Sequence, residues 1–296
     1  MKSFIKNEFA KIIAKRSQWA VSLYQANKDN PFEPKKIDNI KYPLISAEDI
    51  NDCNASFVAD PFLVKSDNQF YLFFEIKNDD INRGVIGVAS SQDGLNYNYE
   101  KIVLQENFHL SYPAVYNINN QWFMIPETGE SNEVRIYTTN NFPYDWKLQK
   151  TLLKGRNFAD TTIIFHKNTW YLFVSDDTHT LLEIYYSDKF DGEYKPHSKN
   201  PIYQNKKIAR PAGHLFKFNN KLYRFSQDCS RRYGEKVNMF EITELTPFEY
   251  EEKFIKHIFE PIAGINWNAK KTHHICYLEL EDKYLIATDG EGFKRK

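Results

Sequence analysis

The sequence predicts an all-β fold: a five-bladed β-propeller with four-stranded antiparallel blades, a ring closed by N-terminal strands, and a short N-terminal helix. Two observations lead to this prediction. Aromatic residues make up 16% of the 296 residues, including 19 Tyr and 23 Phe, and such residues favour pleated, half-buried surfaces. A strand-rich unit of roughly 50 residues also recurs along the chain, and that period is typical of propeller blades.

The repeated unit begins with an apolar strand, continues through a turn of Asn, Asp or Lys, and enters a second strand rich in aromatic residues. Aligning Phe73, Ile125, Phe173, Phe225 and Ile286 gives separations of 52, 48, 52 and 61 residues. The expected second strands cover residues 70–75, 122–127, 170–175, 222–227 and 283–288. A pair of β-sandwiches is the competing fold, but it does not explain the period.

Further strand-like runs complete most blades. The expected third strands cover 85–91, 134–139, 182–187 and 237–243, and the expected outer strands cover 101–104, 149–153 and 201–203. The fifth unit stops near Asp289, before its outer strands. Runs at 19–24 and 41–45 are therefore expected to complete the fifth blade and close the ring. Residues 17–296 then form one propeller domain, and residues 1–16 precede it.

The N-terminal segment has the pattern of a short basic amphipathic helix. Phe4, Phe9, Ile12 and Ile13 would form its apolar face, for which we expect docking on the chain's own domain. Contact with a membrane surface is the less favoured alternative. No secretory signal or membrane span is apparent in this segment.

Charge and cysteine content narrow the functional classes. The 39 basic and 39 acidic residues balance, so no general attraction to nucleic acid follows. Cys53, Cys229 and Cys276 are odd in number and far apart, which suggests neither a disulfide framework nor a zinc motif. A cytoplasmic location is the expectation.

Polar residues recur at one register of the predicted inner strands. Counting 13 residues back from four of the aligned positions reaches Asp60, Tyr112, Asp160 and His273, and the fourth unit places Arg210 there after two extra residues. Inner strands line the channel of a propeller, so these five side chains are expected to surround one opening. Carboxylates, Tyr and Arg suit sugars and phosphates. The alternative for each residue alone is a structural role, since Asp before Pro often caps a turn.

Other polar residues are expected near the same opening. Glu75 and Glu127 end two aromatic strands, although a carboxylate at a strand end is usually solvated. Loop residues near the channel form a second group of candidates: His109, His214, Asp228, and Arg231 with its neighbours Arg232 and Tyr233. Arg231 and Arg232 together with Arg210 would make a basic pocket for a phosphate or a carboxylated sugar.

Most other chemistries lack their sequence signatures. No Gly-rich dinucleotide loop, P-loop, nucleophile elbow or HExxH motif is present, so no cofactor is expected. His273 and His274 are adjacent, which is not the i, i+4 spacing of helical metal ligands. No metal site is therefore predicted.

Five short motifs stand out along the chain: FVADPF (57–62), HLSYP (109–113), IPE (125–127), ARPAG (209–213) and QDC (227–229). Together they resemble the motifs of a known family, the propeller domain at the N-terminus of plant glucosamine inositolphosphorylceramide transferases, with related bacterial domains in surface-polysaccharide loci. The resemblance covers about residues 17 to 290. More distantly, the chain is similar to the five-bladed propellers of glycoside hydrolase family 43.

The hydrolase resemblance implies roles for individual residues. Asp60 matches the general base and Asp160 matches the carboxylate that tunes the site, while the position of the general acid falls at or near Arg210. An inverting glycosidase needs one carboxylic acid and one carboxylate, and Arg is not a useful proton donor at neutral pH. Glu127 or Glu75 would have to supply the acid from another blade.

Two functional hypotheses follow. In the first, the chain is an enzyme of surface-polysaccharide or glycolipid synthesis that cleaves or transfers an activated or anionic sugar. In the second, it is a non-catalytic module that binds a glycan or nucleotide sugar beside a glycosyltransferase. Both predict a sugar, sugar phosphate or nucleotide sugar as ligand and a polysaccharide-synthesis enzyme as possible partner.

Overall fold

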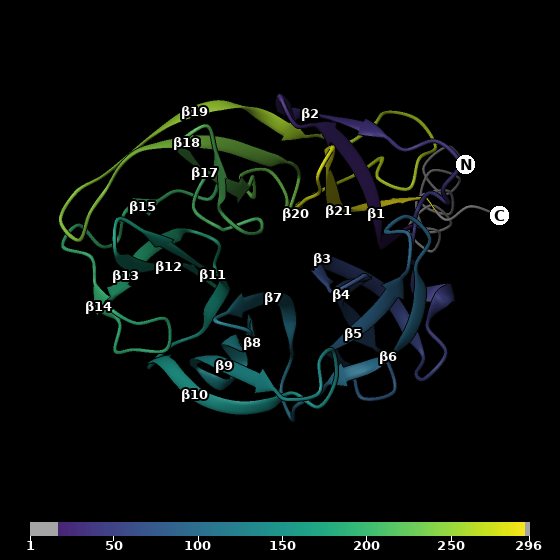
Figure 1. Ribbon diagram of the computed structural model, residues 1–296, viewed down its shortest axis with the longest axis horizontal. Helices are drawn as coiled ribbons and strands as arrows, with labels where there is room; N and C mark the ends of the chain where they lie inside the picture. The colour runs from purple at the N-terminus through teal and green to yellow at the C-terminus, as the bar shows by residue number, and fades with distance from the viewer. Residues whose placement is uncertain (1–16, 294–296) are drawn as a thin grey trace, which may run out of the picture.

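The computed structural model describes residues 17–293 as a ring of five β-sheets around a central axis (Figure 1). Each sheet has a four-stranded antiparallel path from the axis to the rim, as the sequence predicts. The blade I strands are β3 (Ala55–Ser66), β4 (Gln69–Asn78), β5 (Arg83–Ser91) and β6 (Asn98–Leu104). The blade II strands are β7 (Ser111–Ile118), β8 (Gln121–Glu127), β9 (Glu133–Thr139) and β10 (Lys147–Lys154).

The remaining blades vary this plan. The blade III strands are β11 (Phe158–His166), β12 (Thr169–Asp176), β13 (Leu181–Ser187) and β14 (Lys195–Pro196), with β15 (Tyr203–Gln204) also pairing with β13. The blade IV strands are β16 (Phe216–Phe218), β17 (Lys221–Gln227), β18 (Val237–Leu245) and β19 (Tyr250–Phe259). The inner strand of blade IV, β16, is short. Before it, the segment that follows Arg210 pairs with β17 through an isolated bridge between Pro211 and Ser226.

Blade V joins the two ends of the described chain. Its strands from axis to rim are β20 (Ile275–Glu279), β21 (Lys283–Phe293), β1 (Ser17–Asn27) and β2 (Asn30–Lys36). The prediction that N-terminal strands complete this blade is confirmed, and β1 pairs with β21 along its whole length.

The prediction of the outermost strand was only partly right. Residues 41–45 contribute one bridge, between Val21 and Ile45, whereas the strand itself is β2. β2 contains Pro31 and Pro34, which an edge strand tolerates because its outward N–H groups need no partner.

The inner hairpins have the turns that the sequence pattern indicates. In blades II, III and IV both central turn residues have positive φ, as at Asn119 (52°) and Asn120 (63°). Such turns follow the right-handed twist of the strands, and Asn tolerates them better than most residues.

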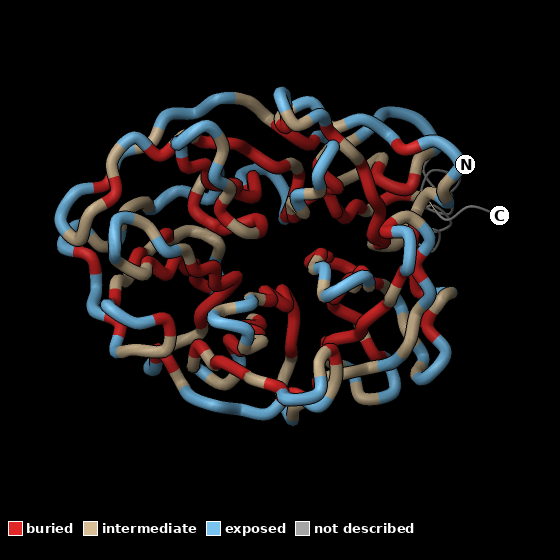
Figure 2. The backbone as a smooth tube through the Cα atoms, viewed as in Figure 1, coloured by how far each residue is buried: buried red, intermediate tan, exposed pale blue. Residues whose placement is uncertain are grey.

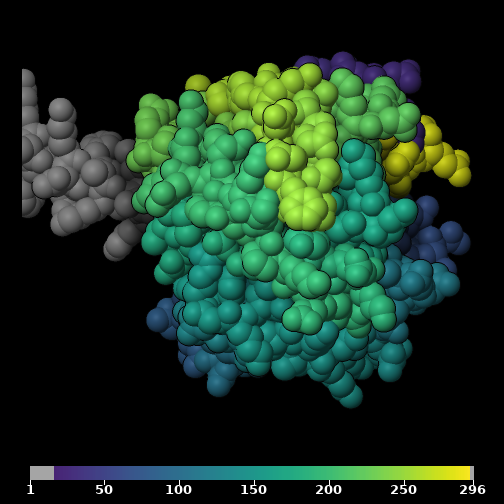
Figure 3. Space-filling model, turned by 90° about the vertical axis from the view of Figure 1, so that its left-hand side faces the viewer, coloured from purple at the N-terminus to yellow at the C-terminus, as the bar shows by residue number. Residues whose placement is uncertain are grey.

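The core lies between the blades. Five buried hydrophobic clusters each fill the space between neighbouring sheets. Figure 2 shows buried segments on the inner and middle strands and exposed segments at the turns and outer edges. Figure 3 shows the flank of the ring filled mainly by the green residues of the middle and later blades.

The described helices are two 3₁₀ turns, η1 (Ala47–Asp49) and η2 (Gly129–Ser131). Within residues 17–293, no helix has the length and apolar character needed to cross a membrane. The helix predicted over residues 1–16 lies outside the described part of the chain.

Candidate functional site

Three inner strands carry a β-bulge at the same register, and each bulge holds a predicted site residue. The pairing registers shift between Ala59 and Phe62, between Ser111 and Ala114, and between Ala159 and Thr162. Asp60, Tyr112 and Asp160 adopt left-handed φ values of 53°, 47° and 51° there. A bulge redirects a side chain relative to the regular pleat. The predicted alignment of these three residues is therefore also a shared backbone geometry.

Arg210 contacts the carboxyl groups of both Asp160 and Glu127. Its Nε donates to Asp160 Oδ2 at 2.5 Å, and its Nη2 contacts Asp160 Oδ1 at 3.1 Å and Glu127 Oε2 at 3.0 Å. The Arg210 side chain is only 7% exposed. A buried guanidinium is neutralised by an ionised carboxylate that it contacts, here that of Asp160. Arg210 therefore binds protein carboxyl groups and does not present a free cation to an anionic ligand.

Asp160 is held as a carboxylate by this arrangement. Burial favours the neutral acid, but the charge and hydrogen bonds of Arg210 outweigh burial and hold the pKa of Asp160 below its ordinary value. Gln227 Nε2 donates a further hydrogen bond to Asp160 Oδ2 at 2.6 Å. Both Asp160 oxygens thus have partners within the protein.

Glu127 is in a different protonation state. Burial raises the pKa of Glu127 to about 8, although Arg210 acts in the opposite direction. Its side chain is 17% exposed, so it is the more accessible of the two carboxyl groups that contact Arg210. A carboxyl group with this pKa is largely protonated at neutral pH and is able to donate a hydrogen bond or a proton.

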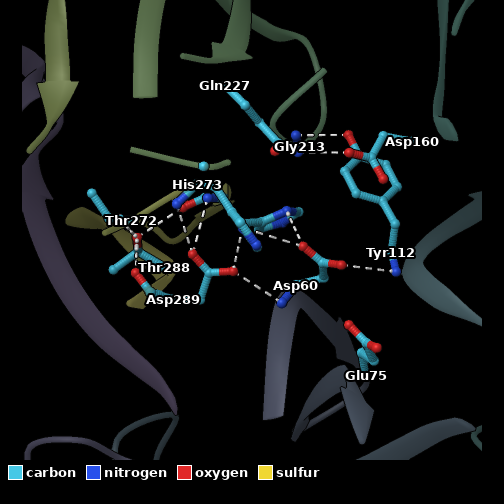
Figure 4. A network of polar contacts seen from close by, with 12 residues as sticks. Asp60, Glu75, Tyr112, Asp160, Gly213, Gln227, Thr272, His273, Thr288 and Asp289 are labelled. Atoms are coloured by element: carbon cyan, nitrogen blue, oxygen red, sulfur yellow. Dashed lines mark hydrogen bonds and ion pairs between the residues drawn. The ribbon is translucent and has the colours of Figure 1, made fainter. Parts of the chain in front are cut away.

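Asp60 also has a raised pKa in this environment. Burial raises the pKa of Asp60 well above its ordinary value, and the nearby carboxyl groups of Asp160 and Glu75 raise it further. Asp60 Oδ2 accepts the backbone N–H of Tyr112 at 3.2 Å, whereas Oδ1 has no hydrogen-bond partner among the described residues. Oδ1 is buried and lies 3.6 Å from His273 Nδ1 and 3.7 Å from His274 Nδ1 (Figure 4).

Asp289 organises the blade V side of the site. Its Oδ1 accepts the backbone N–H groups of His273 and His274 at 2.9 and 3.1 Å, and its Oδ2 lies 2.7 Å from His273 Nδ1. Oδ2 also accepts the backbone N–H of Asp60 at 3.2 Å (Figure 4). Asp60, His273 and Asp289 offer ligand atoms within 4.8 Å of one another, so a small cation has a possible set of donors here. These three residues do not form a recognisable metal-binding motif in the sequence, because two of them are far from Asp60 along the chain.

Glu75 and His109 form an ion pair across blades I and II. His109 Nε2 lies 3.2 Å from Glu75 Oε1, while His109 Nδ1 accepts the Gly84 backbone N–H at 2.9 Å. Because Nδ1 is an acceptor, the proton of a neutral ring is on Nε2, which faces Glu75. Burial opposes protonation of His109, but the bond to Glu75 outweighs it and raises the His109 pKa.

Aromatic side chains cover one side of the opening. The Trp19 and His273 rings stack with centroids 4.1 Å apart, and Tyr233 packs edge-on to His273 at 5.2 Å. The Arg210 guanidinium lies 5.4 Å from the Tyr233 ring centroid. Tyr233 is 37% exposed, so its ring forms part of the accessible rim. Exposed aromatic faces of this kind suit the apolar C–H faces of sugar rings.

Some predicted residues lie elsewhere. His214 packs edge-on between Phe62 and Tyr116, with centroids 4.8 and 4.7 Å away, and burial lowers its pKa to about 4. Asp228 is buried and caps its own loop by accepting the Ser230 N–H at 3.0 Å. Arg231 pairs with Glu235, and its side chain is 78% exposed.

The predicted basic pocket is therefore wrong. Glu235 also lies 3.5 Å from Arg232, so both loop arginines have an acidic neighbour. Arg210, the third member of the proposed pocket, is bound by Asp160 and Glu127.

Sequence reasoning did not select Trp19, His179, Gln227 or Asp289 as site residues. Gln227 had a usable signal, because it stands two residues after the aligned Phe225, as Glu75 and Glu127 stand two after Phe73 and Ile125. His179, whose Nδ1 lies 2.6 Å from Arg210 Nη1, follows a strand in blade III and shares no register with the others. Trp19 belongs to the closing strand, outside the repeat alignment.

Comparison with solved structures shows which folds are similar. The ring of five sheets is similar to the folds of several glycoside hydrolases. It matches a putative glycoside hydrolase from Bacteroides ovatus with a TM-score of 0.61 at 10% identity, covering 89% of this chain and 96% of that one. It also matches the catalytic domain of a GH62 α-L-arabinofuranosidase from Coprinopsis cinerea with a TM-score of 0.58 at 11% identity, covering 92% and 97%. At these identities the likeness concerns the fold alone.

Sequence comparison defines the family. Residues 17–291 match the model of the family described as "Glucosamine inositolphosphorylceramide transferase 1, N-terminal", and the chain belongs to this family. Glucosamine inositolphosphorylceramide transferase 1 of Arabidopsis thaliana is 34% identical over 299 residues, covering 92% of this chain and 39% of that protein. The protein of the same name from Oryza sativa subsp. japonica is 39% identical over 249 residues, covering 80% and 33%. The chain thus spans little more than a third of these relatives.

Proposed function

We propose that this chain is a carbohydrate-binding propeller that serves glycosyl transfer, holding a sugar at the channel opening without hydrolysing it. The relatives are named as glycosyl transferases, and the matched family is their N-terminal part. The ligand class is a sugar, sugar phosphate or nucleotide sugar, bound by hydroxyl contacts to Asp60 and Glu127 and by stacking on Tyr233.

The state of the carboxyl groups carries this proposal. An inverting glycosidase needs an ionised base to activate water. Asp60, at the position of that base, is buried and has a pKa well above its ordinary value. Asp160 is ionised, but Arg210 and Gln227 bind both of its oxygens. Arg210 occupies the position expected for the acid. The site thus offers hydrogen-bond donors and acceptors but lacks an accessible general base.

One observation favours a catalytic alternative. Glu127 has a pKa of about 8 and is partly exposed, which are the properties of a general acid. In that reading the chain cleaves or transfers a sugar with Glu127 as acid, and Asp60 becomes the base after a ligand alters its surroundings.

Replacement of Asp60 separates the two functions. Binding of glucosamine, glucose 1-phosphate and UDP-N-acetylglucosamine is measured by calorimetry, and product formation from the same compounds is followed by mass spectrometry. Asp67→Asn, at an exposed turn of the same hairpin, is the matched control. For a binding module we expect affinity without turnover, and Asp60→Asn largely preserves affinity because the amide has the same size and keeps one hydrogen-bond acceptor. Turnover that Asp60→Asn abolishes supports the enzyme, and failure to bind any of the three probes overturns the proposed function.

A further inference from the structure

His179 stands in the turn between β12 and β13 of blade III, and its backbone has an uncommon conformation. Its φ is 61°, in the left-handed region, which few residues other than glycine adopt. The buried Asp176 fixes this turn. Its backbone oxygen accepts the His179 N–H at 3.0 Å, and its Oδ1 accepts the N–H groups of Thr180 and Leu181, each at 2.8 Å. A well-anchored turn therefore positions the His179 ring.

Arg210 determines which nitrogen of this ring carries the proton. Arg210 Nη1 lies 2.6 Å from His179 Nδ1, and a guanidinium only donates hydrogen bonds, so Nδ1 is the acceptor. Burial and the charge of Arg210 lower the pKa of His179 to about 4, so the ring is neutral at neutral pH. The single proton is therefore on Nε2, which makes His179 Nε2–H a hydrogen-bond donor of fixed direction.

The described part of the protein does not use this donor. Among residues 17–293, His179 Nε2 has no hydrogen-bond partner, and the side chain is only half-buried. His273 and His274 are different, because their ring nitrogens without a partner are closed to solvent, whereas His179 Nε2 is not. The donor on this anchored ring is thus free to bind an acceptor from outside the protein.

Two other groups adjoin His179 because they contact the same arginine. Glu127 Oε2 accepts from Arg210 Nη2 at 3.0 Å, so Glu127 and His179 bind the two terminal nitrogens of one guanidinium. Glu127 Oε1 accepts no hydrogen bond from the described residues, and it too is open to solvent. The Tyr233 ring centroid lies 5.2 Å from that of His179 and 5.4 Å from the Arg210 guanidinium carbon. A donor, a carboxyl oxygen and an aromatic face from three blades therefore meet around Arg210.

We propose that His179 is a ligand-binding residue of the channel site, and that its Nε2–H donates to a hydroxyl oxygen of a sugar ring. This inference rests on the proposed function and names the part of the ligand that is bound here. A hydroxyl group accepts one hydrogen bond and donates another, so it matches the imidazole N–H and the Glu127 carboxyl oxygen together. The Tyr233 face suits the C–H groups of the same ring. Asp160 compensates the charge of Arg210, so this position favours the sugar ring over a phosphate.

Calorimetric titration of the full chain with glucosamine, glucose 1-phosphate and UDP-N-acetylglucosamine compares wild type with His179→Met and His179→Gln. Only glutamine can both accept from Arg210 and donate to a ligand. We expect His179→Met to weaken every probe that wild type binds about tenfold, the usual effect of one lost hydrogen bond, and His179→Gln to retain most of the affinity. His166→Met, at the other end of β11 from Asp160, is the matched control and should bind as wild type does.

A second measurement does not depend on a ligand. NMR spectra of the ¹⁵N-labelled imidazoles identify the tautomer, and the signal lost in His179→Gln is that of His179. We expect a neutral ring with its proton on Nε2 between about pH 6 and pH 8. A proton on Nδ1, or a charged ring at about pH 6, overturns the inference.

The outcomes separate this inference from the proposed function. If wild type binds a probe and His179→Met binds it equally well, the role of His179 is overturned and the proposed function stands. If His179→Gln loses as much affinity as His179→Met, the donor is not what the ligand uses, and the inference is again overturned. If wild type binds none of the three probes, the proposed function fails, and the role of His179 fails with it.

Discussion

Replacement of Arg210 by Met tests whether this residue holds the acidic site together. Met keeps much of the aliphatic length but removes the charge and all donors. Asp160 then loses its two contacts with Arg210, at 2.5 and 3.1 Å, and Glu127 loses one at 3.0 Å. Asp160 is 1% exposed. Removing one partner of a buried ion pair costs about 3–5 kcal/mol of unfolding free energy. We expect the lower end, about 3 kcal/mol, because Gln227 still donates to Asp160.

Urea unfolding followed by tryptophan fluorescence measures this cost. The pH dependence has a definite sign, because the native pKa of Asp160 is depressed. Its stabilising contribution is present above the unfolded value of about 3.9 and is lost as the pH falls through the lower native pKa. The difference between wild type and Arg210→Met should therefore be large at neutral pH and smaller below about pH 4.

Two further variants make the result decisive. Arg231→Met removes an exposed arginine that also pairs with a glutamate, and its urea midpoint should hardly change. Adding Asp160→Asn to Arg210→Met removes the uncompensated charge and should recover about 1–3 kcal/mol, the usual coupling of residues in direct contact. If Arg210→Met behaves like Arg231→Met, or if the double variant recovers nothing, Arg210 does not neutralise Asp160 as described.

Three other changes give distinct outcomes. Glu127→Gln should flatten the pH dependence of stability, because the native pKa of Glu127, about 8, exceeds its unfolded value of about 4.3 and wild type therefore loses stability as the pH rises between these values. Equal slopes of the thermal midpoint against pH in the two proteins would contradict this. His109→Gln should lower the free energy of unfolding most below about pH 6.5, and progressively less as the pH rises through the raised native pKa of His109. An equal loss at pH 5.5 and pH 9 would exclude a charged pair between His109 and Glu75. Val21→Asp buries a charge in β1 and should lower the free energy of unfolding by more than about 3 kcal/mol, whereas Gln25→Glu, at a half-buried position of the same strand, should not. Equal urea midpoints of the two variants would contradict the role of β1 in closing the ring.

The fold was predictable because its signals are local and repeated. Every blade has an aromatic second strand at the expected place, and the period alone distinguishes a propeller from stacked sandwiches. No strand was predicted at β2, which contains Pro31 and Pro34; whether a strand accommodates proline depends on whether it is central or at an edge. That distinction is a property of the assembled sheet, so residues 30–36 could not be assigned from their own composition.

The site was predictable only in part. Counting along the repeats placed Asp60, Tyr112, Asp160, Arg210 and His273 at one register. In the structure, hydrogen bonds join Asp60 to the Tyr112 backbone and Asp160 to Arg210, and Asp289 bonds to the backbones of both Asp60 and His273. Their protonation states could not be read in the same way. Asp60 and Asp160 occupy equivalent bulges, yet one has a raised pKa and the other a lowered pKa. The difference comes from Arg210, which contacts Asp160 directly, and such a contact between neighbouring blades has no signature in either strand.

The β-bulge that three inner strands share suggests that this register has a functional role. A residue other than glycine in the left-handed region costs on the order of 1 kcal/mol, and Asp60, Tyr112 and Asp160 each adopt it. Regular inner strands would avoid this cost and would direct the same side chains along the ordinary pleat. Backbone strain of this kind typically persists at functional sites. Three strained residues at one register are therefore better explained by ligand recognition at the channel opening than by the stability of the ring.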